Sequence, residues 1–496
     1  MASAAELKQN ASLYLLALGA FAIGTEGFML AGLLPIIAKD LSISLAAAGQ
    51  LVTVFSLSYS ISSPILTTVS ARVNRRRFLI VALLCFTAAN FAACASPGYP
   101  TLLAARVLLA VSAGLYMPSA NALAGSLVAP ERRGRALATV HGGITIAVAL
   151  GVPLGAWIGG HFGWRATFVG IGVLSAIVTL GVVVGLPSGI GANLSVPSLA
   201  QRVAVGRQPA VLVTLLITTL WAAGIWTIYP YLAPFLTGRP GFSGAEVGAV
   251  LLLYGVFAGI GVFISGRAID RLGSGKVLIV CLVVMMLSYE SLTASALHLE
   301  PAHARVAILV AIAAWGAAGW AFNPAQQTKL IGIAGLDVAP VSLSLNSSFT
   351  YLGFALGAAL GSFIVAYSSV ADIGAIGGLS ELAALIITLA ANRYARRACT
   401  SRSRPPPRAP TARRSRDTAR TQDVEGDAMS REGINVPYDT GRTAAAPSDT
   451  SRQLRGQFVG GLIGSSNAPA CCPRTVRPRG RCRGKPSLKR LSLPIR

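Results

Sequence analysis

Four ionisable residues lie inside long apolar stretches of the sequence, where a charged side chain is costly and usually has a function. They are Glu26, Arg106, Glu290 and Glu381. In membrane proteins such residues commonly mark ion or substrate pathways. A low-dielectric environment penalises the charged form of a carboxyl group, so Glu26, near the middle of its stretch, is a candidate for binding and releasing a proton. Arg106 is a candidate for holding substrate or for influencing the protonation of such an acid.

The three acids also have a purely structural interpretation. Glu26 could form a hydrogen bond with a neighbouring helix. Glu290 and Glu381 could be buried against a neighbour or could extend toward the membrane surface. No recognisable motif surrounds these last two acids, so they are the weaker candidates for a role in transport.

Polar and aromatic residues in the apolar stretches predict a binding site for a small amphipathic molecule. A planar, apolar substrate needs aromatic walls with a few polar anchors. Together with Glu26, the candidates for substrate binding are Tyr116, Asn121, Trp226, Tyr229, Asn323 and Gln326. Each of these residues taken alone is also typical of helix packing or of the aromatic belt at a membrane surface.

The elements that must position these residues are membrane-spanning helices. Hydrophobic residues make up 53% of the 496 residues, charged residues only 12%, and the mean hydropathy is +0.63. This composition excludes a disordered chain and an ordinary soluble enzyme. Twelve stretches are long enough to cross about 30 Å of hydrocarbon as helices. They are 13–37, 47–70, 78–96, 101–128, 136–160, 166–186, 209–236, 244–269, 276–297, 305–333, 341–367 and 370–390.

The stretches divide the chain into four parts. We predict an all-α membrane protein with a six-helix bundle over 1–186, a central cytoplasmic loop over 187–208, a second six-helix bundle over 209–391 and a disordered basic tail over 392–496. The first stretch is read as a retained helix rather than a cleaved signal peptide, because a continuous train of similar stretches follows it.

The distribution of basic residues predicts the orientation in the membrane. Short cytoplasmic loops are enriched in Lys and Arg. With the N-terminus inside, fourteen basic residues fall on the inner face, namely Lys8, Arg72, Arg75, Arg76, Arg77, Arg132, Arg133, Arg135, Arg202, Arg207, Arg267, Arg271, Lys276 and Lys329. Only four fall on the outer face, namely Lys39, Arg165, Arg239 and Arg305. Both termini are therefore expected in the cytoplasm.

An internal repeat relates the two bundles. Residues 67–77 correspond to residues 266–276 at an offset of 199, and both segments follow the second helix of their half. The fifth and eleventh stretches share a glycine ladder, with Gly151, Gly155 and Gly159 in one and Gly353, Gly357 and Gly361 in the other. Two related six-helix halves are typical of a secondary transporter whose binding site lies between the repeats.

Two motifs resemble signatures of the major facilitator superfamily. The segment with Gly266, Asp270, Arg271 and Gly273 resembles its loop signature, which implies a role in conformational gating. The first-half copy keeps Arg72, Arg75 and Arg76 but has Ala71 and Asn74 where the signature has Asp and Gly. The alternative is that the first-half arginines only anchor the inner face of the membrane protein.

The second motif resembles the antiporter signature of the drug/proton antiporters, and it comprises Gly151, Pro153, Gly155 and Gly159. Small residues at this spacing let helices approach closely, and a proline bends the helix. The resemblance implies export rather than uptake.

Further segments over nearly all of residues 13–390 resemble the bacterial chloramphenicol, arabinose and purine efflux permeases. They include 21–28, 32–35, 130–135, 163–168 and 323–326. The resemblance implies proton coupling through Glu26 and Arg106. One departure weakens the part of Arg106, because Ala110 stands where the family's Arg-x-x-x-Gly element has glycine.

Other chemistries find no support in the sequence. It contains no glycine-rich phosphate-binding loop, so the driving force is expected from an ion gradient rather than from ATP. The seven cysteines lack metal-ligand spacing, and only four histidines are present. We therefore expect no cofactor, no metal site and no enzyme activity, and we expect a monomer that needs no nucleic acid.

The basic tail carries most of the net charge of +24. Residues 1–390 hold 19 Lys and Arg against 11 Asp and Glu, whereas residues 391–496 hold 23 against 7. The tail is poor in aromatic residues, so it cannot build a core of its own. It could bind anionic lipid or RNA, or it could be an extension without function.

These observations predict a proton-coupled exporter of small amphipathic compounds, such as chloramphenicol-like drugs, in a bacterial inner membrane. Protonation of Glu26 from outside would favour drug release and return of the carrier, and deprotonation inside would prepare it for substrate. Such a protein would confer antibiotic resistance. The alternatives are export of a sugar, a nucleoside or another metabolite by the same fold and, from another class, a membrane enzyme or a receptor.

Overall fold

A computed structural model describes residues 4–69, 73–129, 132–187, 199–238, 240–335 and 338–402. Every regular element in these ranges is a helix, and twelve helical segments are long and apolar enough to cross a membrane. The predicted all-α membrane fold is confirmed. The spans begin and end within a few residues of the predicted stretches, apart from the first and last, because long apolar runs are read directly from the sequence.

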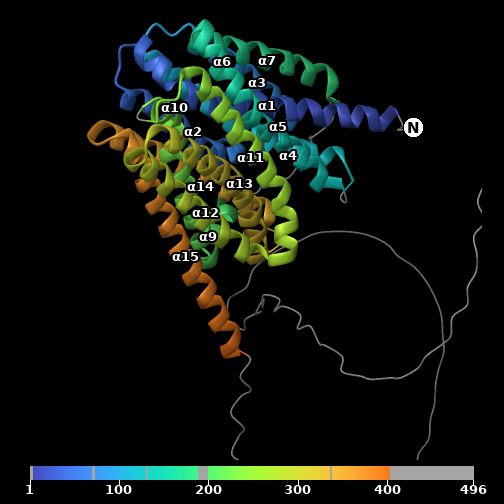
Figure 1. Ribbon diagram of the computed structural model, residues 1–496. Helices are drawn as coiled ribbons and strands as arrows, with labels where there is room; N and C mark the ends of the chain where they lie inside the picture. Colours follow the sequence, from blue (N-terminus) through green and yellow to red (C-terminus); the bar gives the residue numbers. More distant parts are fainter. Residues whose placement is uncertain are drawn as a thin grey trace, which may run out of the picture. The chain divides into compact units, whose positions relative to one another are not determined.

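The first half of the chain forms six of these spans, drawn from blue to teal in Figure 1. The fifth span is composite, because a short π-helix, η3, separates α5 from α6. The helices are α1 (Ala4–Asp40), α2 (Leu45–Val69), α3 (Arg75–Cys94), α4 (Tyr99–Leu127), α5 (Arg133–Ile146), η3 (Ala147–Gly151), α6 (Val152–Phe162) and α7 (Trp164–Gly185).

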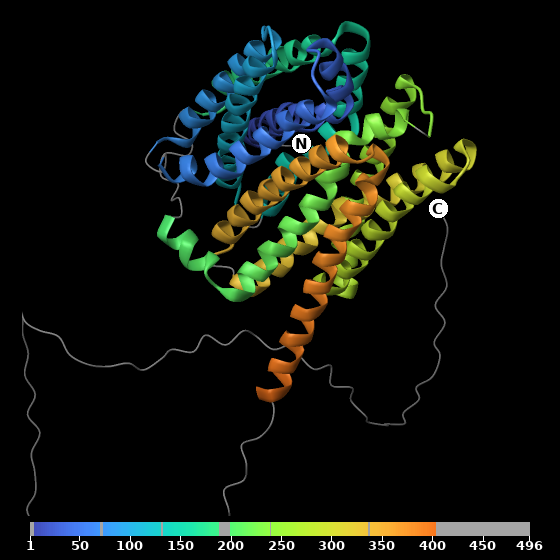
Figure 2. The same cartoon turned by 90° about the vertical axis from the view of Figure 1, so that its left-hand side faces the viewer.

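The second half forms the other six spans, drawn from green to orange in Figure 2 beside the blue and teal helices of the first half. A 3-10 turn, η4, interrupts its first span where the chain passes Pro230. The helices are α8 (Leu199–Gly206), α9 (Pro209–Ile228), η4 (Tyr229–Tyr231), α10 (Leu232–Thr237), α11 (Gly244–Leu272), α12 (Ser274–His298), α13 (Pro301–Ala334), α14 (Ala339–Tyr367), η5 (Val370–Asp372) and α15 (Ile373–Arg402).

The glycine ladders pack corresponding helices together in both halves. A Cβ atom added at Gly151 would collide with Thr25 of α1, and one added at Gly159 would collide with Leu33. In the second half, the would-be Cβ atoms of Gly353, Gly357 and Gly361 meet the backbone of Thr219, Ala223 and Thr227 on α9. The predicted repeat is therefore visible as the same close helix approach, with a constant offset of 194 residues between the facing positions of α1 and α9.

The two halves contact each other along several pairs of helices, among them α2 with α14 and α11 with η3. Gln50 Nε2 of α2 donates to Ser362 Oγ of α14 at 2.8 Å, and Ser60 Oγ donates to the Ser348 carbonyl at 3.0 Å. On the second pair, a Cβ atom at Gly255 of α11 would collide with the backbone at Ala149 of η3. These contacts bring α2 and η3 of the first half and α11 and α14 of the second half to the interface between the repeats.

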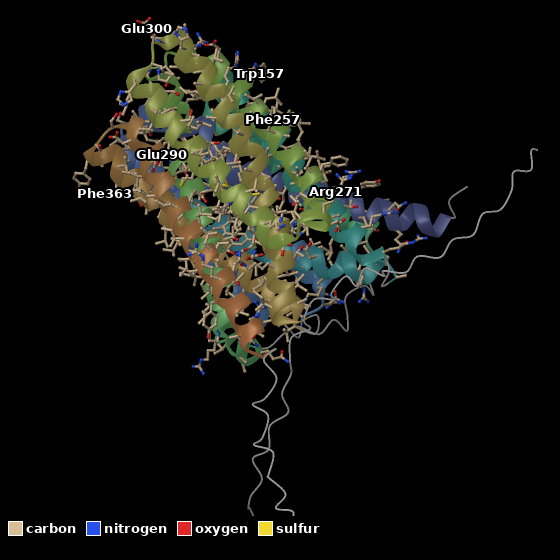
Figure 3. The ribbon with its side chains drawn as sticks, turned by 60° about the horizontal axis from the view of Figure 1, so that its bottom comes forward. Trp157, Phe257, Arg271, Glu290, Glu300 and Phe363 are labelled. Carbon is tan, nitrogen blue, oxygen red and sulfur yellow. The ribbon has the colours of Figure 1, made fainter. Side chains whose placement is uncertain are left out.

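Large apolar side chains cover the outer surface of the helices. Trp157 and Phe363, labelled in Figure 3, are 53% and 61% exposed. In a water-soluble protein so many exposed apolar residues would be a liability, whereas lipid tails accommodate them.

Two segments differ from the predicted boundaries. Helix α8 lies within the predicted central loop, where Val205 packs in a small apolar cluster with Val211, Leu215, Leu330 and Val341. Its eight residues are too short for a pattern to stand out in the sequence. Helix α15 continues to Arg402, past the predicted start of the tail at residue 392. The rest of the predicted tail, residues 403–496, lies outside the described residues.

Candidate functional site

Glu26 of α1 and Arg106 of α4 form an ion pair inside the first half. Nη1 of Arg106 donates a hydrogen bond to Glu26 Oε1, and both side chains are 0% exposed. The sequence predicted the two residues separately as candidates, and the fold brings them together. A buried pair of this kind stays charged only while its partners remain in contact, because removing either charge leaves the other without compensation.

The second helix, α2, completes the surroundings of Arg106. Its Nε donates to the Leu51 carbonyl at 3.3 Å, and the guanidinium lies 4.2 Å from the centre of the Phe55 ring. This cation–π contact favours the charged arginine. Glu26 Oε2 and Arg106 Nη2 are buried and have no hydrogen-bond partner. The pair therefore keeps one free acceptor and one free donor for a proton, a substrate or a rearrangement.

A row of aromatic rings runs from the neighbourhood of this pair into the second half. Tyr351 of α14 lies near enough to Glu26 for an electrostatic interaction. Its ring stacks on Tyr59 of α2 at 3.5 Å between centroids and contacts Phe354 edge-on at 5.2 Å. Phe354 in turn stacks on Trp226 of α9 at 3.5 Å. The row thus joins the ion pair of one half to the aromatic residues of the other.

A second set of rings, here called the aromatic group, meets the end of this row. It comprises Phe28, Trp226, Tyr229 and Trp320. The centroid of the Phe28 ring of α1 lies 5.1 Å from that of Trp226 and 5.9 Å from that of Tyr229. It lies 6.1 Å from the ring centroid of Trp320 of α13. Phe28, Trp320 and Tyr351 are only half-buried, whereas Trp226 and Tyr229 are buried. The half-buried rings keep part of their surface accessible, whereas the buried rings do not.

The structure brings some predicted substrate residues together and places others elsewhere. Trp226 and Tyr229 join the aromatic group beside Phe28. Tyr116 instead packs α4 against α1, where its hydroxyl donates to the Leu16 carbonyl at 2.8 Å. Gln326 ties α13 to α9, because its Nε2 donates to the Thr214 carbonyl at 2.7 Å.

The two asparagines of the predicted set have polar neighbours other than the rings. Asn323 Oδ1 accepts from Gln327 Nε2 at 3.1 Å on the same helix. Asn121 Nδ2 lies 3.3 Å from Nε2 of His141 on α5, and its Oδ1 is buried without a partner. A role of these residues in substrate binding remains a prediction.

The antiporter segment, residues 151–159, lies directly against the part of α1 that carries Glu26. Gly151 faces Thr25, the neighbour of Glu26, and Gly155 approaches Met29 with 3.3 Å between its would-be Cβ and the Met29 Cβ. The π-helix η3 ends at Gly151, two residues before Pro153, which lacks a backbone N–H. Such π-turns often accompany functional sites. The glycines allow the close approach of α1 to η3 and α6 beside Glu26.

The first gating segment is described only in part, because Arg72 lies outside the described residues. Asn74, which departs from the signature, caps α3 by accepting hydrogen bonds from the backbone N–H groups of Arg76 and Arg77. The Arg76 guanidinium donates to the carbonyls of Val183 and Leu186 at the end of α7. Arg76 therefore ties helices within one half, at a helix end where a cation is favourable.

The second gating segment connects α11 with α12. Asp270 and Arg271 are exposed and form no ion pair with a described residue. Gly273 has φ +81°, a conformation that favours glycine, and it ends one helix and begins the next. Gly266 is exposed one turn before Asp270. The gating role of these residues, and of Arg75, remains a prediction.

Sequence reasoning missed most of the aromatic row. Phe55, Tyr59, Tyr351 and Phe354 come from two helices of different halves, and Phe28 was noticed only within a family motif. Tyr59 lies on the second span and Tyr351 on the eleventh, and these two spans pack together. Comparison of these two spans for aromatic residues facing each other is the signal that would have found them.

The described residues contain no group of three or more His, Cys, Asp or Glu side chains that could hold a metal ion. The site itself contains a carboxyl group paired with a guanidinium, and stacked aromatic rings.

Comparison with known proteins places the chain in a family of transporters. The profile of the Major Facilitator Superfamily matches residues 16–238 and 214–425. An uncharacterized MFS-type transporter of Bacillus subtilis, YbcL, is 34% identical over 379 residues, which cover 76% of this chain and 94% of the relative. The inner membrane transport protein YdhP of Escherichia coli is 32% identical, covering 80% and 100%. A chloramphenicol resistance protein of Streptomyces lividans is 30% identical, covering 74% and 91%.

Solved structures share the fold at low identity. The nucleoside transporter NupG superposes with a TM-score of 0.64 at 11% identity, covering 77% of this chain and 99% of that one. A peptide transporter, POT, superposes with a TM-score of 0.63 at 15% identity, covering 80% and 99%. With twelve membrane-spanning helices, a repeated architecture and a profile that matches both halves, the chain belongs to the major facilitator superfamily.

Proposed function

We propose that this transporter exports small amphipathic compounds from the cytoplasm in exchange for protons, with both termini in the cytoplasm of a bacterial cell and the helices in its inner membrane. The observation that carries the proposal is the fully buried pair of Glu26 and Arg106 beside aromatic rings contributed by both halves. The pair supplies a site for a proton, and the half-buried rings supply a surface for an apolar or planar substrate.

The geometry suggests how proton and substrate would compete. Protonation of Glu26 from outside would weaken its attraction to Arg106, since only the carboxylate carries a charge. The freed guanidinium and the rings around it would then lose the arrangement that holds substrate, which favours release. Loss of the proton to the cytoplasm would restore the pair and prepare the carrier for substrate. Both steps use groups already in contact, so little rearrangement is needed at the pair itself.

The resemblance of the antiporter segment to the drug/proton antiporter signature supports export as the direction of transport. The segment holds Thr25, and with it Glu26, against η3 through close helix contacts. The S. lividans relative is named for chloramphenicol resistance, which favours a chloramphenicol-like substrate over the sugar or nucleoside alternative.

A susceptibility panel in an efflux-deficient bacterial host tests the proposal. Wild-type protein, the Glu26→Gln variant and the empty vector would be compared at equal membrane levels against chloramphenicol and other amphipathic drugs. We expect lower susceptibility to at least one drug with the wild-type protein alone. Unchanged susceptibility throughout, combined with export of a labelled sugar or nucleoside, would replace drugs by the alternative substrates.

A further inference from the structure

The second half of the molecule contains a buried carboxyl group that the proposed mechanism does not use. Glu381 of α15 is 0% exposed, and neither Oε1 nor Oε2 has a hydrogen-bond partner. It forms no ion pair with a described residue. In this respect it differs from Glu26, whose charge is matched by Arg106.

A glycine on the neighbouring helix makes room for this carboxyl group. A Cβ atom at Gly224 of α9 would stand 2.6 Å from Glu381 Oε1 and 3.1 Å from the Gly377 carbonyl. Any side chain at position 224 would therefore displace the acid. The carboxyl group is held against the backbone of α9, the helix that carries Trp226 and leads into Tyr229 in the aromatic group.

The internal repeat relates the position of Glu381 to that of Glu26. The glycine ladders relate α1 to α9 with an offset of 194 residues, so Leu220 stands where the first half has Glu26. The second half thus lacks a carboxyl group on its own first helix. Glu381 brings one to that helix from α15, next to Gly224, one turn beyond Leu220.

The groups that face Glu381 are neutral or acidic. From α12, Tyr289 and Cys281 interact electrostatically with it, and Glu290 approaches α15 at Gly378 on the exposed side. Helix α9 contributes no titratable residue. Since no cation compensates it, a charged carboxylate here would be strongly penalised, and the neutral acid is the form that this environment accepts.

A line of polar and aromatic groups connects this acid with the aromatic group. Tyr289 contacts Trp315 edge-on at 5.3 Å, and Trp315 contacts Tyr229 at 6.2 Å. The Tyr289 and Tyr229 hydroxyls and Trp315 Nε1 are all buried without a hydrogen-bond partner. Buried polar groups are normally paired, so several unpaired groups in one line are informative.

We propose that Glu381 is a second proton-binding group, neutral in the conformation described, and that the line through Tyr289 and Trp315 links its protonation to the aromatic group. A proton from water on one side of the membrane adds to the carboxylate, and the neutral acid gives the same proton to water on the other side in the alternate conformation. The inference that this proton is coupled to export rests on the proposed function. The inference that Glu381 is neutral does not depend on the proposed function.

Infrared spectroscopy of the protein in liposomes tests the protonation state without any substrate. At neutral pH the wild-type protein should show the C=O stretch of a neutral buried carboxyl group, and Glu381→Gln should lose that component. Glu290→Gln, an acid on the neighbouring helix, is the matched control and should keep it. Tyr289→Phe should retain the component but shift its frequency, which protects the test if Glu381→Gln folds poorly. An unchanged carboxyl band in Glu381→Gln and in Tyr289→Phe would overturn the proposal.

The coupling is tested in proteoliposomes with chloramphenicol as the probe and the membrane potential clamped at zero. With two protons exchanged per substrate, a pH difference of one unit sustains a substrate ratio of about 100, and with one proton about 10. We expect Glu381→Gln to lower the ratio from about 100 toward about 10. Glu26→Gln should abolish accumulation, because in the proposed function the Glu26 proton competes directly with substrate and obligatory exchange depends on it. A ratio unchanged by Glu381→Gln would refute the second coupled proton. A wild-type ratio of one, with the infrared component present, would instead count against the proposed function.

Discussion

Arg106 donates a hydrogen bond to Glu26 from a side chain that is completely buried, and the acceptor is equally buried. The guanidinium also contacts Phe55 and the Leu51 carbonyl, both on α2, so groups from two neighbouring helices, α1 and α2, hold it. A buried pair of this kind is expensive to assemble and is weak evidence of stability, because replacing both charges by apolar groups often stabilises a protein. Its retention here is better explained by a role in function.

Removing one partner of the pair should therefore be worse than removing both. Arg106→Met leaves the Glu26 carboxylate uncompensated, and we expect a loss of about 3–5 kcal/mol of stability. The double variant Glu26→Gln with Arg106→Met leaves no buried charge and should recover most of this loss. Thermal unfolding of the purified proteins in detergent measures both. Additive effects of the two substitutions would contradict the importance of the pair.

The close approach of α1 to the antiporter segment should depend on Gly151. Valine at this position would collide with Thr25, and overpacking of this kind costs about 1–3 kcal/mol. Gly160→Val provides a matched control in the same span, because nothing lies within 4 Å of a Cβ atom there. We expect Gly151→Val to reduce export at equal membrane levels, and Gly160→Val to leave it unchanged. Equal behaviour of the two variants would show that the contact with Thr25 does not matter.

The gating segment should affect turnover more than binding. Asp270 is exposed and unpaired among the described residues, so an ion pair formed only in the alternate conformation would bias the two states by about 1–3 kcal/mol. Asp270→Asn should slow transport in proteoliposomes and leave substrate affinity nearly unchanged. Glu300→Gln, an exposed acid distant from Arg271 in Figure 3, serves as the control. Parallel losses of affinity and turnover in Asp270→Asn would argue against gating.

Removal of residues 403–496 should leave export intact. The segment carries half of the net charge of +24, and its composition cannot form a core. The structure sets the cut after Arg402, where α15 ends. A shorter version ending at Ala391 loses Asn392, whose Oδ1 accepts a hydrogen bond from Lys329 Nζ at 3.2 Å. Less of this shorter protein should be present in the membrane. Export must be normalised to the protein present in the membrane. Normal insertion without export after the first cut would make the tail functional.

The sequence predicted the helices well and their faces poorly. Membrane spans follow from apolar length alone, so twelve spans were found with small boundary errors. Which face of a helix is buried depends on the helices beside it, and these are not known from the sequence. The sequence therefore does not show that Tyr116 and Gln326 form hydrogen bonds between helices, or that Tyr351 lies near Glu26. Substrate binding by Tyr116 and Gln326 remains a prediction. Glu26 and Arg106 were identified because an ionisable residue in an apolar span is rare enough to be noticed without a structure.

Transport by Glu26→Gln in proteoliposomes tests the central claim most directly. Glutamine keeps the volume and most hydrogen bonds of the acid but cannot exchange a proton. The compound identified by the susceptibility panel would be measured in two modes, namely accumulation driven by a pH gradient and exchange of labelled for unlabelled compound without a gradient. We predict that Glu26→Gln loses the driven accumulation and retains exchange, while Glu290→Gln retains both. Full gradient-driven accumulation by Glu26→Gln would contradict the assignment of Glu26 as the coupling group.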